Sequence, residues 1–325
     1  MITNAGGTAG AYAGCQTVRT MRWPDFLVIG AYNCSTTSLR RELAQHPQLF
    51  LPAEPEPSYF AFDGAGGWPR LLPPAHDDPF RQRRTTDADD YRRLFGGARI
   101  DQLVGECSPE YLREPGSAAR IHAQVPGVRC IAVLRDPVAR AWSDHLLHVR
   151  DGLEHRTFEE AVAAPAGAIQ PDGALPHLLE TGRYAAQLEP YLHAFGADQV
   201  LVLILEEWDG DRAGLLATVC RFLGVDPSFS FAAAHRFNAT GVPGSAGARA
   251  WYRLRRRLRP IVPVRLHGGR TARRVDALLG RRLERPEPSE AVVRSLAAHY
   301  ADDVRALEGL LGRHLPWPTA EAARR

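Results

Sequence analysis

The chain has 325 residues, of which 45% are hydrophobic and 24% are charged, a globular composition with enough length for one large α/β domain or two small ones. Its formal net charge of +3 is too small to indicate a nucleic-acid-binding protein, and no run of eighteen apolar residues that could span a membrane occurs. The 40 basic residues are all arginines. A genome poor in A and T would produce the same bias.

The N-terminal residues 1–23 are small and polar without periodicity, which predicts a disordered leader, or an upstream extension if translation begins at Met21. They contain no apolar core of the signal-peptide type, so a cytoplasmic location is the default expectation. The fold is expected to begin near Asp25. Residues 24–318 are predicted to form one domain, and residues 319–325 a tail.

Three apolar runs predict strands covered on both faces, as in a parallel sheet: "FLVIGAY" from Phe26, "RCIAVLRDP" from Arg129 and "QVLVLILEEW" from Gln199. The stretch "IDQLVGECSP" from Ile100 predicts a weaker fourth strand. Segments with helical spacing lie between them, at Leu39 with Leu43, in "TFEEAVAA" and in "YAAQLEPYLHAF". The alternation predicts a three-layer α/β/α sandwich with a central parallel sheet, similar to P-loop-containing nucleotide hydrolases.

Three further segments have distinct compositions. Residues Asp63 to Arg84 read as a long loop that could form a wall of a substrate cleft. The arginine-rich stretch from Arg253 to Arg259 is either a solvated helix face or a surface for an anionic ligand. "SEAVVRSLAAHYADDVRALEGLLG" predicts an amphipathic helix near the C-terminus.

Metal and disulfide sites are not predicted. The cysteines Cys15, Cys34, Cys107, Cys130 and Cys220 are odd in number and lack paired spacing, so they read as buried thiols. The "HDD" group at His76 has no further ligand at suitable spacing. His145 and His148 are expected to face solvent or pack, with a role as a base as the lesser alternative.

The segment "FLVIGAYNCSTTSLRRELAQHP" predicts an anion site. A strand ending at Gly30, a tight turn and a helix opening at Thr36 and Thr37 would gather backbone N–H groups and two hydroxyls around one point. A Walker A loop requires G-x-x-x-x-G-K-[ST], and this chain has Ser35 at the second glycine and Thr36 at the lysine. The pattern therefore disfavours an NTPase.

The same segment resembles the 5′-phosphosulfate loop of the PAPS-dependent sulfotransferases, G-x-x-K-x-G-T-T-S-L, with Asn33 at the lysine and Ser35 at the glycine. "HPQLFLPAEPEPSYF" resembles the family's "HP…KEPHFF" segment, with Pro55 at a second lysine. "GECSPEYL", "VLRDPVARAWSDHLLH", "GRYAAQLEPYL" and "RFNATGVP" also have counterparts in the family, in the same order. The resemblance covers residues 26–241 and the C-terminal helix.

This resemblance implies a set of roles. Glu56 falls on the general base, and Asn33 replaces the cation beside the leaving group. The residues implied in binding PAPS or PAP are Cys34, Ser35, Thr36, Thr37, Ser38, Arg135 and Ser143. Tyr184 either lines the cleft or belongs to the core, and Arg249 stands near a basic residue that relatives use for the 3′-phosphate. No metal is implied.

The residues also support these roles on physical grounds. A nucleotide with phosphates at both ends needs two anion sites, which the loop and Arg135 with Ser143 can supply. Glu56 could take a proton if burial raised its pKa. Losing the loop lysine resembles losing one preorganised donor, about 3 kcal/mol or roughly a hundredfold in rate. Arg40 or Arg41, one turn into the helix, could reach the phosphates instead.

Two functional interpretations follow. The first is a bacterial, cytoplasmic enzyme that transfers a sulfuryl group from PAPS to a hydroxyl or amine of a small molecule, a specialised metabolite or a carbohydrate, without nucleic-acid or membrane partners. The second is a sulfotransferase-like protein that has lost this transfer and catalyses another reaction in the same cleft, or only binds a ligand. The acceptor is not predicted, and a homodimer stays open.

Overall fold

The computed structural model describes residues 21–61, 85–164, 178–232, 241–244, 247 and 283–324. Several predictions lie outside these residues: the cleft wall from Asp63 to Arg84, the arginine-rich stretch from Arg253 to Arg259, and Arg249. None of the helices in the described part of the chain has the length and apolar composition that crossing a bilayer requires.

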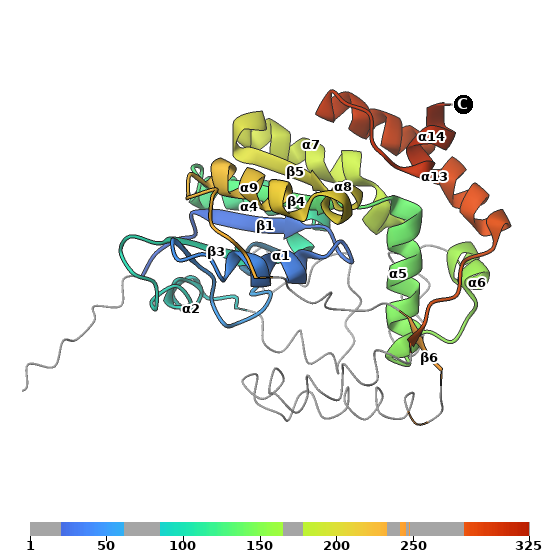
Figure 1. Ribbon diagram of the computed structural model, residues 1–325, viewed down its shortest axis with the longest axis horizontal. Coiled ribbons are helices and arrows are strands. Elements are labelled where there is room, and N and C mark those ends of the chain that lie inside the picture. The colour runs from blue at the N-terminus through green and yellow to red at the C-terminus, as the bar shows by residue number, and fades with distance from the viewer. Residues whose placement is uncertain are drawn as a thin grey trace, which may run out of the picture.

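A five-stranded parallel sheet forms the centre of the fold, with strand order β2-β3-β1-β4-β5 (Figure 1). Its strands are β1 (Phe26–Gly30), β2 (Leu49–Phe50), β3 (Leu103–Cys107), β4 (Arg129–Leu134) and β5 (Val200–Ile204). The four strands predicted from apolar runs are all present, and the two-residue edge strand β2 was not predicted. The prediction of a central parallel sheet is confirmed.

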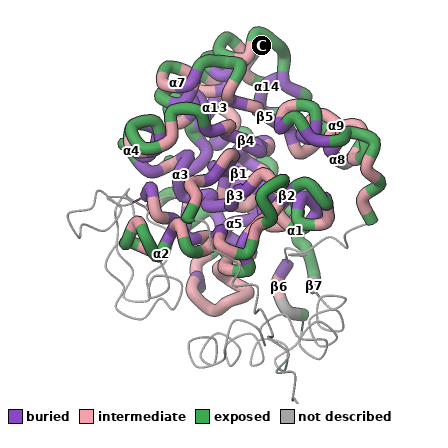
Figure 2. Tube along the Cα trace, turned by 90° about the vertical axis from the view of Figure 1, so that its left-hand side faces the viewer, coloured by how far each residue is buried: buried purple, intermediate pink, exposed green. Residues whose placement is uncertain are grey.

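Helices cover both faces of the sheet, as the continuous apolar runs require. Figure 2 shows α4 (Ser117–Gln124) and α7 (Tyr184–Phe195) on one side of the strands, and α1 (Thr36–Leu43) and α9 (Arg212–Leu223) on the other. Every residue of β1 is buried. The three-layer α/β/α sandwich is therefore confirmed.

The remaining elements surround this sandwich. They include the helices α2 (Ala88–Arg93), α3 (Glu110–Arg113), α5 (Pro137–Arg150), α6 (Phe158–Ala163), α8 (Leu205–Gly210), α13 (Glu290–Leu311) and α14 (Pro318–Arg324), the 3₁₀ turns η1 (Tyr59–Ala61), η3 (Glu180–Gly182) and η4 (Ala197–Gln199), and the antiparallel pair β6 (Val242–Pro243) and β7 (Leu283–Glu284).

Local sequence explains where the helix that carries the second anion motif begins. Asp136 precedes α5 and its side chain accepts hydrogen bonds from the N–H groups of Val138 and Ala139, at 2.9 and 3.0 Å. Pro137 follows at the first helical position, where no N–H is needed. The "RDP" sequence therefore turns the chain sharply from β4 into α5.

Both ends of the described chain differ from the expected leader and tail. Trp23 packs against Tyr59 and Tyr91, with ring centroids 5.9 Å away in each case. Residues 318–324 form α14, in which Thr319 and Ala320 are buried. The folded part therefore begins before residue 24 and includes most of the expected tail, because both ends carry aromatic or small residues that fit against the core.

The strand order reverses at β1, where a ligand-binding crevice is expected. The chain runs outward from β1 to β2, returns to β3, and then crosses to β4 on the other side of β1. In open parallel sheets, ligands bind outside the carboxyl ends of the strands at the point where the order reverses. The three segments that follow β1, β3 and β4 carry the predicted loop, the "ECSP" element and Arg135.

Candidate functional site

The loop after β1 has the backbone conformation of an anion-binding turn. Asn33 and Ser35 have φ values of 60° and 62°, in the left-handed region. Asparagine adopts this conformation more readily than most residues, whereas serine replaces the glycine that the region favours. The Ala31 N–H donates to the Val133 carbonyl of β4 at 2.8 Å, which attaches the loop to the neighbouring strand.

The first turn of α1 leaves donors free for a ligand. The N–H groups of Ser38 and Leu39 bond to the Ser35 carbonyl at 2.9 and 3.1 Å, and the Ser35 side chain caps no N–H group. In the described part of the chain, the N–H groups of Thr36 and Thr37 have no acceptor. The helix dipole adds positive potential at this point, so the arrangement can hold a phosphate.

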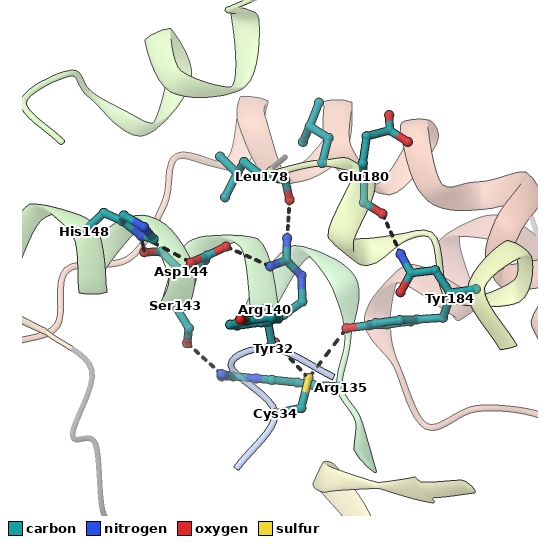
Figure 3. Close-up of polar contacts among 12 residues, drawn as sticks. Tyr32, Cys34, Arg135, Arg140, Ser143, Asp144, His148, Leu178, Glu180 and Tyr184 are labelled. Carbon is teal, nitrogen blue, oxygen red and sulfur yellow. Dashed lines mark hydrogen bonds and ion pairs between the residues drawn. The ribbon is translucent and has the colours of Figure 1, made fainter. Parts of the chain in front are cut away.

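Two predicted ligand side chains lie beneath the loop instead of facing the crevice. Cys34 and Tyr184 are fully buried, and the Cys34 Sγ lies 3.7 Å from the Tyr184 hydroxyl (Figure 3). Burial raises the pKa of the Cys34 thiol to about 11, so the thiol stays protonated. Their side chains support the loop, and only the backbone of Cys34 belongs to its surface.

Arg135 and Ser143, the residues of the second predicted anion site, contact each other. The Arg135 Nη1 donates to the Ser143 Oγ at 2.6 Å, so the guanidinium and the hydroxyl meet at one point (Figure 3). Arg135 is partly exposed, whereas Ser143 is buried. A phosphate oxygen placed there could accept hydrogen bonds from both side chains.

A buried ionic group holds the helix behind this pair. Arg140 is fully buried and donates to the Asp144 Oδ2 at 3.0 Å and to the Leu178 carbonyl. Burial would raise the pKa of Asp144, but the His148 hydrogen bond and the Arg140 charge hold it below its usual range. His148 therefore packs against Asp144, and His145 stacks on Trp142 with ring centroids 5.5 Å apart.

The segment that carries Glu56 adjoins the element after β3. Glu56 is half-buried and has a φ of 51°. The Ser58 hydroxyl donates to the Glu56 carbonyl at 3.2 Å, and the Ser58 N–H donates to the Ser108 Oγ at 2.9 Å. The Ser108 hydroxyl in turn donates to the Glu106 Oε2 at 2.7 Å. These bonds connect the backbone of the Glu56 turn to the buried carboxylate of Glu106.

Arg40 was one of two arginines that could have reached the phosphates in place of the loop lysine, but its guanidinium binds backbone carbonyl groups. Its Nη2 donates to the carbonyl of Pro52 and, at 3.3 Å, to that of Ala53. The contact ties α1 to the segment before Glu56 and uses the guanidinium for structure. Arg41 lies exposed on the helix.

No protein-family model matches the chain. It is 30% identical over 206 residues to the human heparan sulfate glucosamine 3-O-sulfotransferase 3B1, which covers 62% of this chain and 46% of that protein. The mouse 3-O-sulfotransferase 6 is 28% identical over 306 residues, covering 91% of this chain and 74% of that protein. The chain spans about half the length of several of these curated relatives.

A crystal structure of a sulfotransferase from Alicyclobacillus acidocaldarius superposes with a TM-score of 0.68 and 29% identity, over 94% of this chain and all of the other. The chain is therefore similar to sulfotransferases in sequence and in fold. The family resemblance read from the loop and from the later motifs is therefore confirmed, and the fold agrees with it over nearly the whole length.

Glu106 is a residue near the Glu56 turn to which the sequence assigned no role. It is 1% exposed and also accepts from the Tyr91 hydroxyl at 3.1 Å. Burial raises its pKa to about 7, against the hydrogen bonds from Tyr111, Ser108 and Tyr91, and the Glu56 charge adds to the rise. The sequence feature that could have identified Glu106 is a glutamate near the end of a predicted apolar strand.

The described residues near the end of β1 can also be compared with the requirements of a metal site. Among them, no group of three or more His, Cys, Asp or Glu side chains could hold an ion. The groups that these segments offer are the α1 N-terminus, the Arg135 and Ser143 pair, and the Glu56 turn, whose backbone is connected through Ser58 and Ser108 to Glu106.

Proposed function

We propose that this protein transfers a sulfuryl group from PAPS to a hydroxyl or amine of a small molecule or carbohydrate. The observation that carries the proposal is the pairing of two anion sites, one at the start of α1 and one at Arg135 and Ser143, after the adjacent strands β1 and β4. A nucleotide with phosphates at its 5′ and 3′ ends needs such a pair.

The residues present fit this nucleotide. The N–H groups of Thr36 and Thr37 and the hydroxyls of Thr37 and Ser38 would hold the 5′ end, and Arg135 with Ser143 would hold the 3′-phosphate. Cys34 and Tyr184 would support the loop from beneath. The bound nucleotide would supply the activated sulfuryl group.

Glu56 is the proposed general base. It would take the proton of the acceptor hydroxyl or amine as that atom attacks sulfur, while the bridging oxygen leaves with the 5′-phosphate. The link through Ser58 and Ser108 to Glu106 supports the assignment, because it holds the Glu56 turn against a second carboxylate. A negative neighbour makes a carboxylate a stronger base.

Asn33 would donate a neutral hydrogen bond where relatives place a lysine. The loss of one preorganised cation corresponds to about 3 kcal/mol, or roughly a hundredfold in rate. The proposed enzyme is therefore slow unless another cation reaches the leaving group.

The named substrates of the similar proteins suggest only a broad class of acceptor for this chain. Several of them are named as sulfotransferases of heparan sulfate or other carbohydrates. The full-length match to a sulfotransferase of Alicyclobacillus supports a bacterial enzyme. We propose a sugar or a hydroxylated or aminated metabolite as the acceptor, in the bacterial cytoplasm and in specialised metabolism.

The decisive experiment is a calorimetric titration of PAP into the purified protein and into Arg135→Ala. We expect micromolar binding by the wild type and a loss of at least tenfold in the variant, because one charged hydrogen-bond donor to phosphate is removed. A folded wild type that shows no PAP binding would contradict the proposed function and favour a different reaction in the inherited crevice.

A further inference from the structure

Arg113 places a positive charge beside the phosphate loop from a neighbouring element. It is the last residue of α3, which follows the "ECSP" element after β3. The preceding residue, Leu112, packs so closely on Gly30 that a Cβ on that glycine would lie 2.5 Å from the Leu112 Cβ. The end of α3 is therefore packed against the end of β1, where the loop starts.

The Arg113 guanidinium lies over the ring of Tyr32, with 4.1 Å between its Cζ and the ring centroid. Tyr32 belongs to the loop and precedes Asn33. A guanidinium at this distance over an aromatic face gains a cation–π interaction and is held in one orientation. Its charge consequently stands next to the position where relatives carry the lysine.

The surroundings leave this guanidinium short of acceptors. The Arg113 side chain is only 12% exposed, and its nearest carboxylate, Glu110 Oε1, is 3.9 Å away, which is longer than a hydrogen bond. Among the described residues, the ring of Tyr32 and this carboxylate are its contacts. A guanidinium has five N–H donors, and a largely buried charge is expected to be hydrogen-bonded.

We propose that Arg113 binds an oxygen of the 5′-phosphosulfate group and supplies the positive charge that Asn33 does not. This inference rests on the proposed function. Charge accumulates on the bridging oxygen as its bond to sulfur breaks, and that oxygen leaves with the 5′-phosphate. A fixed guanidinium stabilises this charge without transferring a proton, since arginine stays protonated.

Within the described part of the chain, Arg40 and Arg135 are already engaged in other contacts. Arg40 donates to two backbone carbonyls, and Arg135 donates to Ser143 at the second anion motif. Arg113 comes from the element after β3 and meets the loop from the side opposite β4. In a chain without lysine, an arginine fixed on a loop tyrosine is the structural equivalent of the lost cation.

The test compares two nucleotides, PAP and adenosine 3′-monophosphate, which lacks the 5′-phosphate. Each is titrated into the wild type, Arg113→Gln, Arg113→Lys and Arg93→Gln, the last changing an exposed arginine of α2. We expect Arg113→Gln to weaken PAP binding by about ten- to hundredfold and adenosine 3′-monophosphate binding by less than about twofold. Arg113→Lys should keep most of the affinity, and Arg93→Gln all of it.

If a folded Arg113→Gln variant kept the wild-type ratio of affinities for PAP and adenosine 3′-monophosphate, Arg113 would not bind the 5′-phosphate, and the proposal would be overturned. An Arg113 that binds an anionic acceptor instead would give this result. The proposed function would then still stand if the wild type binds PAP through Arg135. Absence of PAP binding by the wild type would overturn both proposals. The two failures are therefore distinguishable.

A second variant pair tests whether the two positions are equivalent. Asn33→Lys should restore PAP affinity in the Arg113→Gln background by about tenfold or more, and should gain much less in the wild type. Equal gains in both backgrounds would show that the sites act independently and would contradict the proposal. Thermal unfolding of each variant shows whether the protein is folded in the titration.

Discussion

Glu106 is a buried carboxylate whose surroundings differ strongly from those of a free glutamate. It lies at the end of β3 with 1% of its surface exposed, and its carboxylate accepts hydrogen bonds from Tyr91 and Ser108. These bonds favour the charged form, but burial outweighs them and raises its pKa to about 7. The group therefore changes charge near neutrality, in contact with the turn that holds Glu56.

Glu106→Gln should change how stability depends on pH. The folded-state pKa lies above the ordinary value of 4.5, so the contribution of Glu106 is fully present below pH 4.5 and is lost as the pH rises to about 7. Between these limits, the wild type should lose about 3 kcal/mol of unfolding free energy relative to the variant. Urea unfolding of both proteins across this pH range measures the difference.

The exposed Glu290, in the first turn of α13, provides the matched control. Glu290→Gln should leave the pH profile of the wild type unchanged. If Glu106→Gln and the wild type showed parallel profiles from pH 4.5 to 8, Glu106 would titrate as an ordinary exposed glutamate, and its proposed effect on the base would fail.

At the scale of elements, Trp317 helps attach the C-terminal helices to the segments that carry the proposed site. Trp317 precedes α14, is fully buried, and donates from its Nε1 to the Glu206 Oε2 at 2.9 Å. Its ring lies 6.0 Å from that of Tyr184, which supports the phosphate loop. The other Glu206 oxygen accepts from the Asp136 N–H at 3.0 Å, so the same carboxylate braces the start of α5.

Trp317→Ala should destabilise the protein by about 4 kcal/mol, because it removes a large buried side chain and leaves a cavity. Denaturant unfolding gives the value. The control is Leu310→Ala on α13, where the side chain is 40% exposed and the loss should stay below about 1 kcal/mol. Similar losses in the two variants would contradict an anchoring role for Trp317 and leave α14 loosely attached.

The whole molecule is expected to unfold as one domain that the nucleotide stabilises. The proposed ligand groups follow β1 and β4, and α5 and α7 pack against α13, so the site and the C-terminal helices share one structure. PAP at a hundred times its Kd should raise the free energy of unfolding by about 2.7 kcal/mol. Calorimetry should show a single transition that moves with PAP.

Arg135→Ala should reduce this shift to about 1.4 kcal/mol or less at the same PAP concentration, because its affinity for PAP is expected to fall at least tenfold. Two transitions, of which only one moves with PAP, would contradict the prediction of a single domain over residues 24–318. The number of unfolding transitions therefore tests whether the chain forms one domain, without requiring an assay of sulfuryl transfer.

The sequence by itself determined the sheet and the turns on which the two proposed anion sites lie. Continuous apolar runs at Phe26, Arg129 and Gln199 predict buried parallel strands, because a strand covered on both faces needs apolar residues at every position. The "STTS" and "RDP" turns predict the helix starts, because a loop, a cap and a first turn are local features of the chain.

Only the tertiary structure showed which short elements form, and which charged groups have altered surroundings, through contacts with residues distant in the sequence. Strand β2 has two residues and exists through its pairing with β3, and α14 forms against α13. The pKa of Glu106 is set by burial beneath η1 and α2, and Arg113 meets Tyr32 only because α3 packs on Gly30. Burial and electrostatic contact are properties of surroundings that residues far apart in the chain create together.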